Sequence, residues 1–200
     1  MDKFLRTISR ILLAGLLIFE LLNEFEILNF TLNFTWLGLA LTSIIAWSII
    51  ETASYFLKKY CGHPIAGLAA IVAVAAIYLD AFGDILGFYG KYSWYDQAAH
   101  LLGSAAAGGL LLFIIYSFTQ CGKIKLGFMV QGLFALSATA LLGVTYELEE
   151  YLEDYFTGSH RLGDGPDTAN DLLLDVAGAL LAILISIIYL KLVKKKTVNT

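Results

Sequence analysis

The chain has 200 residues, of which 58% are hydrophobic and 15% are charged, and its formal net charge is −4. A soluble domain carries about 25% charged residues, so this composition excludes an ordinary soluble protein and indicates an integral membrane protein. We therefore expect membrane lipids, and not nucleic acid, to be its partners.

Six apolar stretches of the chain are close to the roughly 20 residues that a helix needs to cross the hydrocarbon core of a bilayer. A cleaved signal peptide is the alternative interpretation of the first stretch, but acidic residues follow it directly and it lacks a small-residue cleavage site. We predict a single all-α domain over residues 1–200, a bundle of six transmembrane helices at about 4–22, 36–57, 64–83, 97–118, 126–146 and 171–192.

The basic residues predict the orientation of this bundle, because cytoplasmic loops of membrane proteins are enriched in Lys and Arg. In the six-helix topology only Lys91 and Arg161 fall on one side, and the other 11 of the 13 basic residues fall on the side of the termini. The acidic residues show the opposite bias, since only Asp2 and Glu51 of the 17 belong to the basic side. We therefore expect a multi-pass protein of the cell membrane with both termini in the cytoplasm and an acidic extracytoplasmic end.

The two cysteines, Cys61 and Cys121, both fall in loops on the basic side of this topology. The cytoplasm is reducing, and disulfides rarely persist there. We therefore expect no disulfide between them.

Small residues mark one face of two predicted helices. Ser104 lies four residues before Gly108 in the helix at 97–118, and the helix at 171–192 contains Ala-Gly-Ala at 177–179. Such small residues let two helix backbones approach closely in a membrane. We expect these two helices to pack on each other, and the same faces offer a contact for a homo-oligomer.

Carboxylates recur three or four residues apart at the acidic ends of the last four helices, a spacing that places them on one helical face. A charge that faced lipid at the depth of Asp175 would cost at least ~3 kcal/mol, so Asp175 and Asp171 should face the bundle interior. Glu149 and Glu153, by contrast, are expected on a solvated acidic surface. The spaced residues are Asp80 and Asp84, Asp96 and His100, Glu147 and Glu150, and the series Asp164, Asp167, Asp171 and Asp175.

So many carboxylates cannot share one site while fully ionised, and a divalent cation would balance their charge. Oxygen ligands with one imidazole suit Mg²⁺, Mn²⁺, Ca²⁺ or Fe²⁺ better than Zn²⁺. Asp167 is equally suited to stabilise a helix N-terminus. The expected metal ligands are Glu147, Glu150, Asp167, Asp171 and Asp175. His100 is the expected acid–base group, with Asp96 beside it, and Arg161 and Lys91 would contact an anionic substrate. Further acidic candidates for the site are Asp80, Asp84 and Asp164.

Three motifs together resemble the YjdF-like family of bacterial and archaeal membrane proteins, and are more distantly similar to the VanZ-like proteins. They are Tyr95-Asp96-x-x-x-His100, Tyr146-Glu147-x-x-Glu150 and Asp167-Thr168-x-x-Asp171-x-x-x-Asp175-x-x-Gly178-Ala179, within residues 80–182. The resemblance implies a compact helical membrane fold in which the acidic positions share one polar site. It implies no particular reaction.

Three functions are compatible with these residues. The first is a metal-dependent hydrolase or transferase that acts on a lipid head group or an isoprenoid phosphate, since a bound cation stabilises charge that develops on phosphate oxygens. The second is a transporter or channel for cations or protons, which would require polar residues through to the inner side. The third is a structural membrane protein that a metal stabilises.

Overall fold

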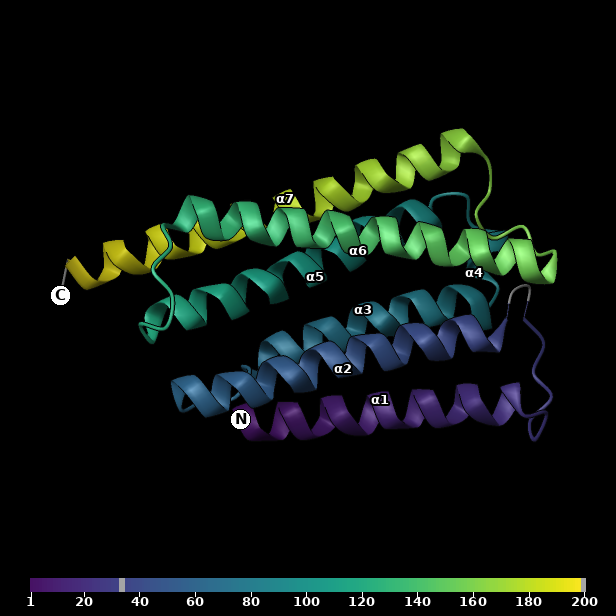
Figure 1. Cartoon of the computed structure of the whole chain (residues 1–200), viewed down its shortest axis with the longest axis horizontal. Coiled ribbons are helices and arrows are strands. Elements are labelled where there is room, and N and C mark those ends of the chain that lie inside the picture. The colour runs from purple at the N-terminus through teal and green to yellow at the C-terminus, as the bar shows by residue number, and fades with distance from the viewer. Residues whose placement is uncertain (33–34, 199–200) are drawn as a thin grey trace.

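The computed structural model describes residues 1–32 and 35–198, with side chains to residue 190. All regular structure in these residues is helical, and the long helices run alongside one another with both termini toward the same end of the bundle (Figure 1). The helices are α1 (Asp2–Glu24), α2 (Trp36–Cys61), α3 (Gly67–Ile85), the short α4 (Phe88–Lys91), α5 (Tyr95–Gln120), α6 (Phe128–Thr157) and α7 (Gly165–Val198).

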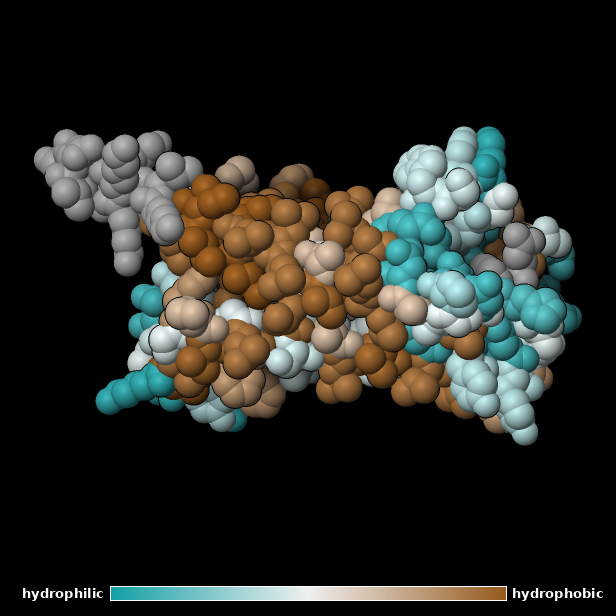
Figure 2. Space-filling model, turned by 90° about the horizontal axis from the view of Figure 1, so that it is seen from above, coloured by the Kyte–Doolittle hydropathy of each residue, from teal (hydrophilic) through white to brown (hydrophobic). Residues whose placement is uncertain are grey.

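The bundle consists of two three-helix groups. α1 packs against α2 and α3, α6 and α7 pack against α5, and α5 also packs against α3 and so joins the groups (Figure 1). The acidic end, formed by α4, the end of α6 and the start of α7, lies opposite the termini. A hydrophobic belt separates this polar end from the polar surface near the termini (Figure 2).

Five helices of the described chain are long and apolar enough to cross a membrane: α2, α3, α5, α6 and α7 as far as Leu190. This confirms a multi-pass helical membrane protein. The sixth predicted span, in α1, does not meet the same measure, because charged residues interrupt its apolar stretch. Two of these face α2: Arg10 donates to both carboxylate oxygens of Glu51, at 2.6 and 2.7 Å, and Glu20 accepts a hydrogen bond of 3.1 Å from Ser43.

α6 is longer than its apolar stretch predicts. The apolar residues end near Tyr146, but the helix continues to Thr157 and stops at Gly158, whose φ of 73° places it in the left-handed region that favours glycine. The extension is rich in Glu, which has a high helix propensity even though it ends a hydrophobic run. α7 likewise begins at Gly165, six residues before its expected start, so that Asp167 lies in its first turn.

The expected close packing of small residues is present between α5 and α7. A Cβ added to Gly108 would lie 3.0 Å from the Cα of Ala179, and one added to Gly178 would overlap the carbonyl oxygen of Leu101. These glycines therefore allow the two backbones to touch within one chain, and the homo-oligomer remains a prediction.

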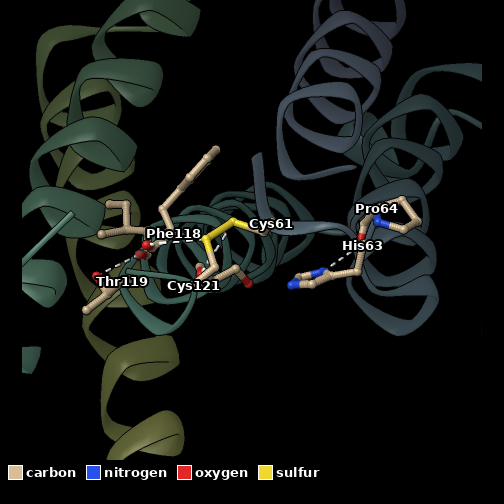
Figure 3. Close-up of a disulfide and its surroundings, with 8 residues drawn as sticks. Cys61, His63, Pro64, Phe118, Thr119 and Cys121 are labelled. Atoms are coloured by element: carbon tan, nitrogen blue, oxygen red, sulfur yellow. Dashed lines mark hydrogen bonds between the residues drawn. A yellow bond between two sulfur atoms is a disulfide. The ribbon is translucent and has the colours of Figure 1, made fainter. Parts of the chain in front are cut away.

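The expectation of unpaired cysteines is wrong. Cys61 ends α2, Cys121 directly follows α5, and their Cα atoms lie 5.4 Å apart in a disulfide (Figure 3). The two cysteines meet because α2 and α5 end side by side, which the redox state of a compartment does not reveal. The bond joins the two helix groups at the end of the bundle that holds the termini.

Candidate functional site

The polar end of the bundle contains two neighbouring groups of side chains. The His100 cluster comprises Asp96, His100, Glu147, Asp171 and Asp175. The Arg161 cluster comprises Asp80, Asp84, Glu150, Glu153 and Arg161. α3, α5, α6, α7 and the α6–α7 connection all contribute residues, so the two clusters exist only when these elements pack together.

In the His100 cluster the imidazole lies among carboxylates from three helices. Its Nδ1 lies 3.2 Å from Oδ1 of Asp175 on α7, while its Nε2 lies 3.8 Å from Asp96 on α5 and 3.9 Å from Glu147 on α6. The His100 side chain is only 8% exposed. Ser104, one turn further along α5, donates a hydrogen bond of 2.5 Å to the same oxygen of Asp175. The two nitrogens of His100 therefore face different carboxylates.

A glycine of α6 makes room for the buried Asp175. A Cβ added to Gly143 would overlap the Asp175 carboxylate. Sequence reasoning did not single out Gly143, although an isolated glycine inside a helix usually has a packing reason. The signal was therefore present in the sequence, but it did not reveal which side chain Gly143 accommodates.

Three residues of the His100 cluster lie close enough together that they could share a cation. Asp96, His100 and Asp171 each offer one ligand atom, and these three atoms lie within 4.8 Å of one another, which is compatible with ligand distances of about 2.0–2.6 Å from a shared ion. Both carboxylate oxygens of Glu147 and one each of Asp171 and Asp175 are buried without a hydrogen-bond partner among the described residues. Buried polar atoms are normally hydrogen-bonded. A bound ligand or a proton would therefore stabilise these oxygens.

The Arg161 cluster surrounds one guanidinium with acids. Arg161 Nε donates to Glu150 at 2.9 Å, and its Nη1 lies 3.5 Å from Glu153 and 3.8 Å from Asp84. The arginine side chain is 4% exposed. Burial by itself would lower the pKa of Arg161, but the neighbouring Tyr146 and acidic groups raise that pKa well above its ordinary value, so the guanidinium stays charged.

Tyr146 connects the two clusters. Its hydroxyl donates to Asp80 at 2.9 Å and accepts a hydrogen bond from Arg161, while its ring meets the His100 ring edge-on at 5.8 Å between centroids. Tyr89 of α4 donates to the same Asp80 oxygen at 2.7 Å. Burial and the adjacent Asp80 raise the pKa of Tyr89 well above its ordinary value, so its hydroxyl remains a donor.

A cavity of about 270 Å³ adjoins both clusters. Asp80, His100, Tyr146 and Asp175 line one part of it, and most of the remaining lining is apolar and comes from α2, α3, α5 and α6. Ligand sites in proteins commonly combine such an apolar wall with a few polar groups. Separate helices form the walls, so no local sequence pattern marks this cavity.

The predicted residues fall into three sets in the structure. Asp96, His100, Glu147, Asp171 and Asp175 gather as the His100 cluster, with the half-buried Asp167 nearby on α7, whereas Glu150, Asp80 and Asp84 lie with Arg161. Lys91 is exposed over the Tyr92 ring, and the exposed Asp164 accepts a hydrogen bond from the backbone of Asp167.

Glu153 corrects one expectation. It is buried beside Arg161 rather than on a solvated surface, because α6 continues past the apolar stretch and turns this residue inward. Glu149 is half-buried on the same helix. The hydroxyls of Tyr89 and Tyr146 also belong to the site, and no sequence motif marks their hydrogen bonds to Asp80.

The fold and the site define a multi-pass α-helical membrane protein with a buried acid–histidine site at one end of its bundle. Comparison with known families gives a match over residues 5–192 to the family described as "Predicted membrane protein (DUF2238)", and the chain belongs to that family. Neither the curated proteins nor the solved structures gave a significant match. The family supports the expected membrane-protein resemblance in general terms, while the YjdF-like name and the VanZ-like similarity stay predictions.

Proposed function

We propose that this protein is a divalent-metal-dependent membrane enzyme that acts on the phosphate-bearing head group of a lipid at the extracytoplasmic face. The observation that carries the proposal is the convergence of Asp96, His100 and Asp171, whose ligand atoms lie within 4.8 Å of one another. An apolar cavity that adjoins this polar group supports a substrate with a hydrocarbon part.

The geometry around His100 favours a division of roles within the cluster. Its Nε2 faces Asp96 and Glu147, while its Nδ1 faces Asp175 at 3.2 Å. Metal-binding histidines usually use one nitrogen for the metal and the other for a carboxylate that fixes the ring. We therefore assign Asp96, His100 and Asp171 as ligands and Asp175 as the positioning residue, instead of an acid–base role for His100 and a ligand role for Asp175.

A divalent cation at this position would polarise a phosphate oxygen and lower the pKa of a bound water. In hydrolysis, the water oxygen forms a bond to phosphorus as the bond to the lipid oxygen breaks. Glu147 has two buried oxygens without hydrogen-bond partners among the described residues. It would accept the proton that the water loses and return it to the departing lipid oxygen, which leaves as an alcohol. The exposed Lys91 lies at the polar end, where a cation favours the approach of an anionic head group.

Arg161 has a different role in this proposal from the predicted contact with substrate. Four carboxylates and Tyr146 already surround its guanidinium. We assign it to the positioning of the α6–α7 connection beside the site.

Ion transport is less well supported than catalysis. Away from the clusters the cavity is lined mainly by residues such as Ile45 and Leu110, which offer no ligands to a moving ion. Glu51, one of the two acids on the basic side of the bundle, is paired with Arg10. A structural protein stabilised by metal is the alternative that an experiment has to separate from an enzyme.

The test uses the full chain, purified in nanodiscs, with Asp171→Asn compared against Asp164→Asn. Asp164 is exposed, and an amide oxygen there still accepts the hydrogen bond from Asp167. We expect metal content by elemental analysis, and metal-dependent release of phosphate from lipid phosphates, to fall by about 10–100-fold or more in Asp171→Asn alone. Wild-type protein without bound metal and without phosphate release would contradict the enzyme, and bound metal without release would favour the structural alternative.

His100→Gln separates the two roles of the imidazole. If His100 is a ligand, this variant loses bound metal together with turnover. Normal metal content with lost turnover would instead restore His100 as an acid–base group, because glutamine cannot exchange a proton near neutral pH.

A further inference from the structure

The cavity beside the clusters is open toward the bilayer. Two of its lining residues on α2, Leu41 and Ile45, are 42% and 51% exposed, and Thr145 of α6 is also exposed. These residues lie within two of the membrane-crossing helices. The opening therefore lies between α2 and α6, within the membrane-crossing helices.

The inner end of the cavity reaches the His100 cluster. His100 and Ser104 both line it from α5, and Gly103 lies between them on the same wall. A Cβ added to Gly103 would meet no atom within 4 Å. Open space therefore adjoins Gly103, about one helical turn from the imidazole. An apolar group in this space would lie next to the His100 cluster.

The lining chemistry identifies the kind of occupant. An apolar cavity stays dry unless it offers a water two to four polar partners, and most of this lining offers none. In a membrane crossed by α2 and α6, hydrocarbon chains would surround the opening, and such a chain would enter without leaving an apolar environment. The polar part of the lining, which includes Asp80, His100 and Tyr146, lies beside the two clusters. The head group of a lipid whose chain occupies the apolar part would lie there.

We infer that the cavity binds one hydrocarbon chain of a bilayer lipid, which enters sideways between α2 and α6 and places its phosphate-bearing head at the His100 cluster. The inference rests on the proposed function and specifies its substrate class as a membrane-resident lipid rather than a water-soluble phosphate ester. Acyl and isoprenyl chains share the required chemistry, and the experiment distinguishes them.

The test is photocrosslinking in nanodiscs, with adducts mapped by mass spectrometry. One probe is phosphatidic acid with a diazirine in an acyl chain, and the other is a polyisoprenyl phosphate with a diazirine in its chain. We expect adducts on Leu110 and Leu142, which line the cavity from α5 and α6. The probe that labels them identifies the type of chain.

Variants that fill the cavity are compared with the wild-type protein. Gly103→Leu places a side chain in the open space, and we expect it to reduce adducts on Leu110 and Leu142 by about tenfold. Gly15→Leu is the matched control, because Gly15 of α1 is exposed, has no atom within 4 Å of an added Cβ, and does not line the cavity. Ala46→Leu, on the α2 wall, repeats the test if Gly103→Leu does not fold.

Adducts confined to lipid-facing residues outside the cavity, or unchanged by Gly103→Leu and Ala46→Leu, would overturn the inference. Labelling requires neither metal nor turnover. Labelling of the cavity in a protein without metal would therefore contradict the proposed enzyme and support the lipid site. Metal-dependent turnover without labelling of the cavity would contradict only the lipid site.

Discussion

Asp175 shows why single residues of this site are sensitive to their neighbours. Its carboxylate is buried, accepts a hydrogen bond from Ser104, faces Nδ1 of His100, and lies against Gly143. The inward direction of Asp175 was predictable, because a charge at its depth is costly in lipid. Its partners were not, because they depend on how α5, α6 and α7 rotate against one another.

Gly143→Ala should disturb the cluster through one methyl group. Alanine favours a helix by about 1 kcal/mol over glycine, but here its Cβ would overlap the Asp175 carboxylate. Gly132→Ala is the control on the same helix, where the nearest atom to an added Cβ is a methyl of Ile183 at 3.4 Å. We expect Gly132→Ala to retain stability and bound metal, and Gly143→Ala to lose metal and melt at a lower temperature. Equal melting and metal content in the two variants would show that Asp175 moves aside freely.

At the scale of elements, the sequence predicted which segments are helices better than it predicted where the helices end at the polar side. Apolar stretches located the five membrane-crossing helices, since a span requires a long hydrophobic run. The same criterion ended α6 near residue 146 and began α7 near residue 171, although both helices extend further. The extensions carry Glu150, Glu153 and Asp167 into the site. The connection between them, with Arg161, then folds back over the acids, an arrangement set by tertiary contacts rather than by hydropathy.

Arg161→Met tests what this connection contributes to stability. Removal of the guanidinium leaves Asp84, Glu150 and Glu153 buried beside one another, and loss of one partner from a buried ion pair costs about 3–5 kcal/mol. We expect a clear fall in melting temperature in nanodiscs. Lys91→Met, at the other basic residue of this end, is the control and should change stability by no more than about 0.5 kcal/mol, because Lys91 is exposed. Similar melting temperatures of both variants would show that the buried carboxylates become protonated when Arg161 is removed.

At the scale of the whole molecule, charge asymmetry supports one orientation in the membrane. The end of α6 and the start of α7, which contribute residues to the acidic clusters, lie opposite the termini (Figure 1). Lys and Arg are concentrated in the sequence on the side of the termini. The enrichment of basic residues in cytoplasmic loops predicts that the acidic end lies outside the cell. The disulfide beside the termini favours the opposite orientation, because disulfides rarely persist in the reducing cytoplasm. The paired cysteines do not report this orientation by thiol labelling, since neither has a free thiol in the disulfide.

Introduced cysteines test the orientation. In a Cys61→Ser/Cys121→Ser background, His160→Cys lies at the acidic end and His63→Cys beside the disulfide position, and both native histidines are exposed. A membrane-impermeant thiol reagent added to intact cells should label His160→Cys and not His63→Cys. Labelling of both after cell lysis is the control for access. The reverse pattern in intact cells would place the candidate site in the cytoplasm.

The disulfide gives the chain a second covalent route between its two helix groups. The polypeptide passes from one group to the other at residues 92–94, at the acidic end, whereas Cys61 and Cys121 join α2 to α5 at the opposite end. A break in the backbone at residues 92–94 would leave α1–α3 tethered to α5–α7, and reduction of the disulfide alone would do the same. With both connections intact, the two groups are joined covalently at both ends of the bundle.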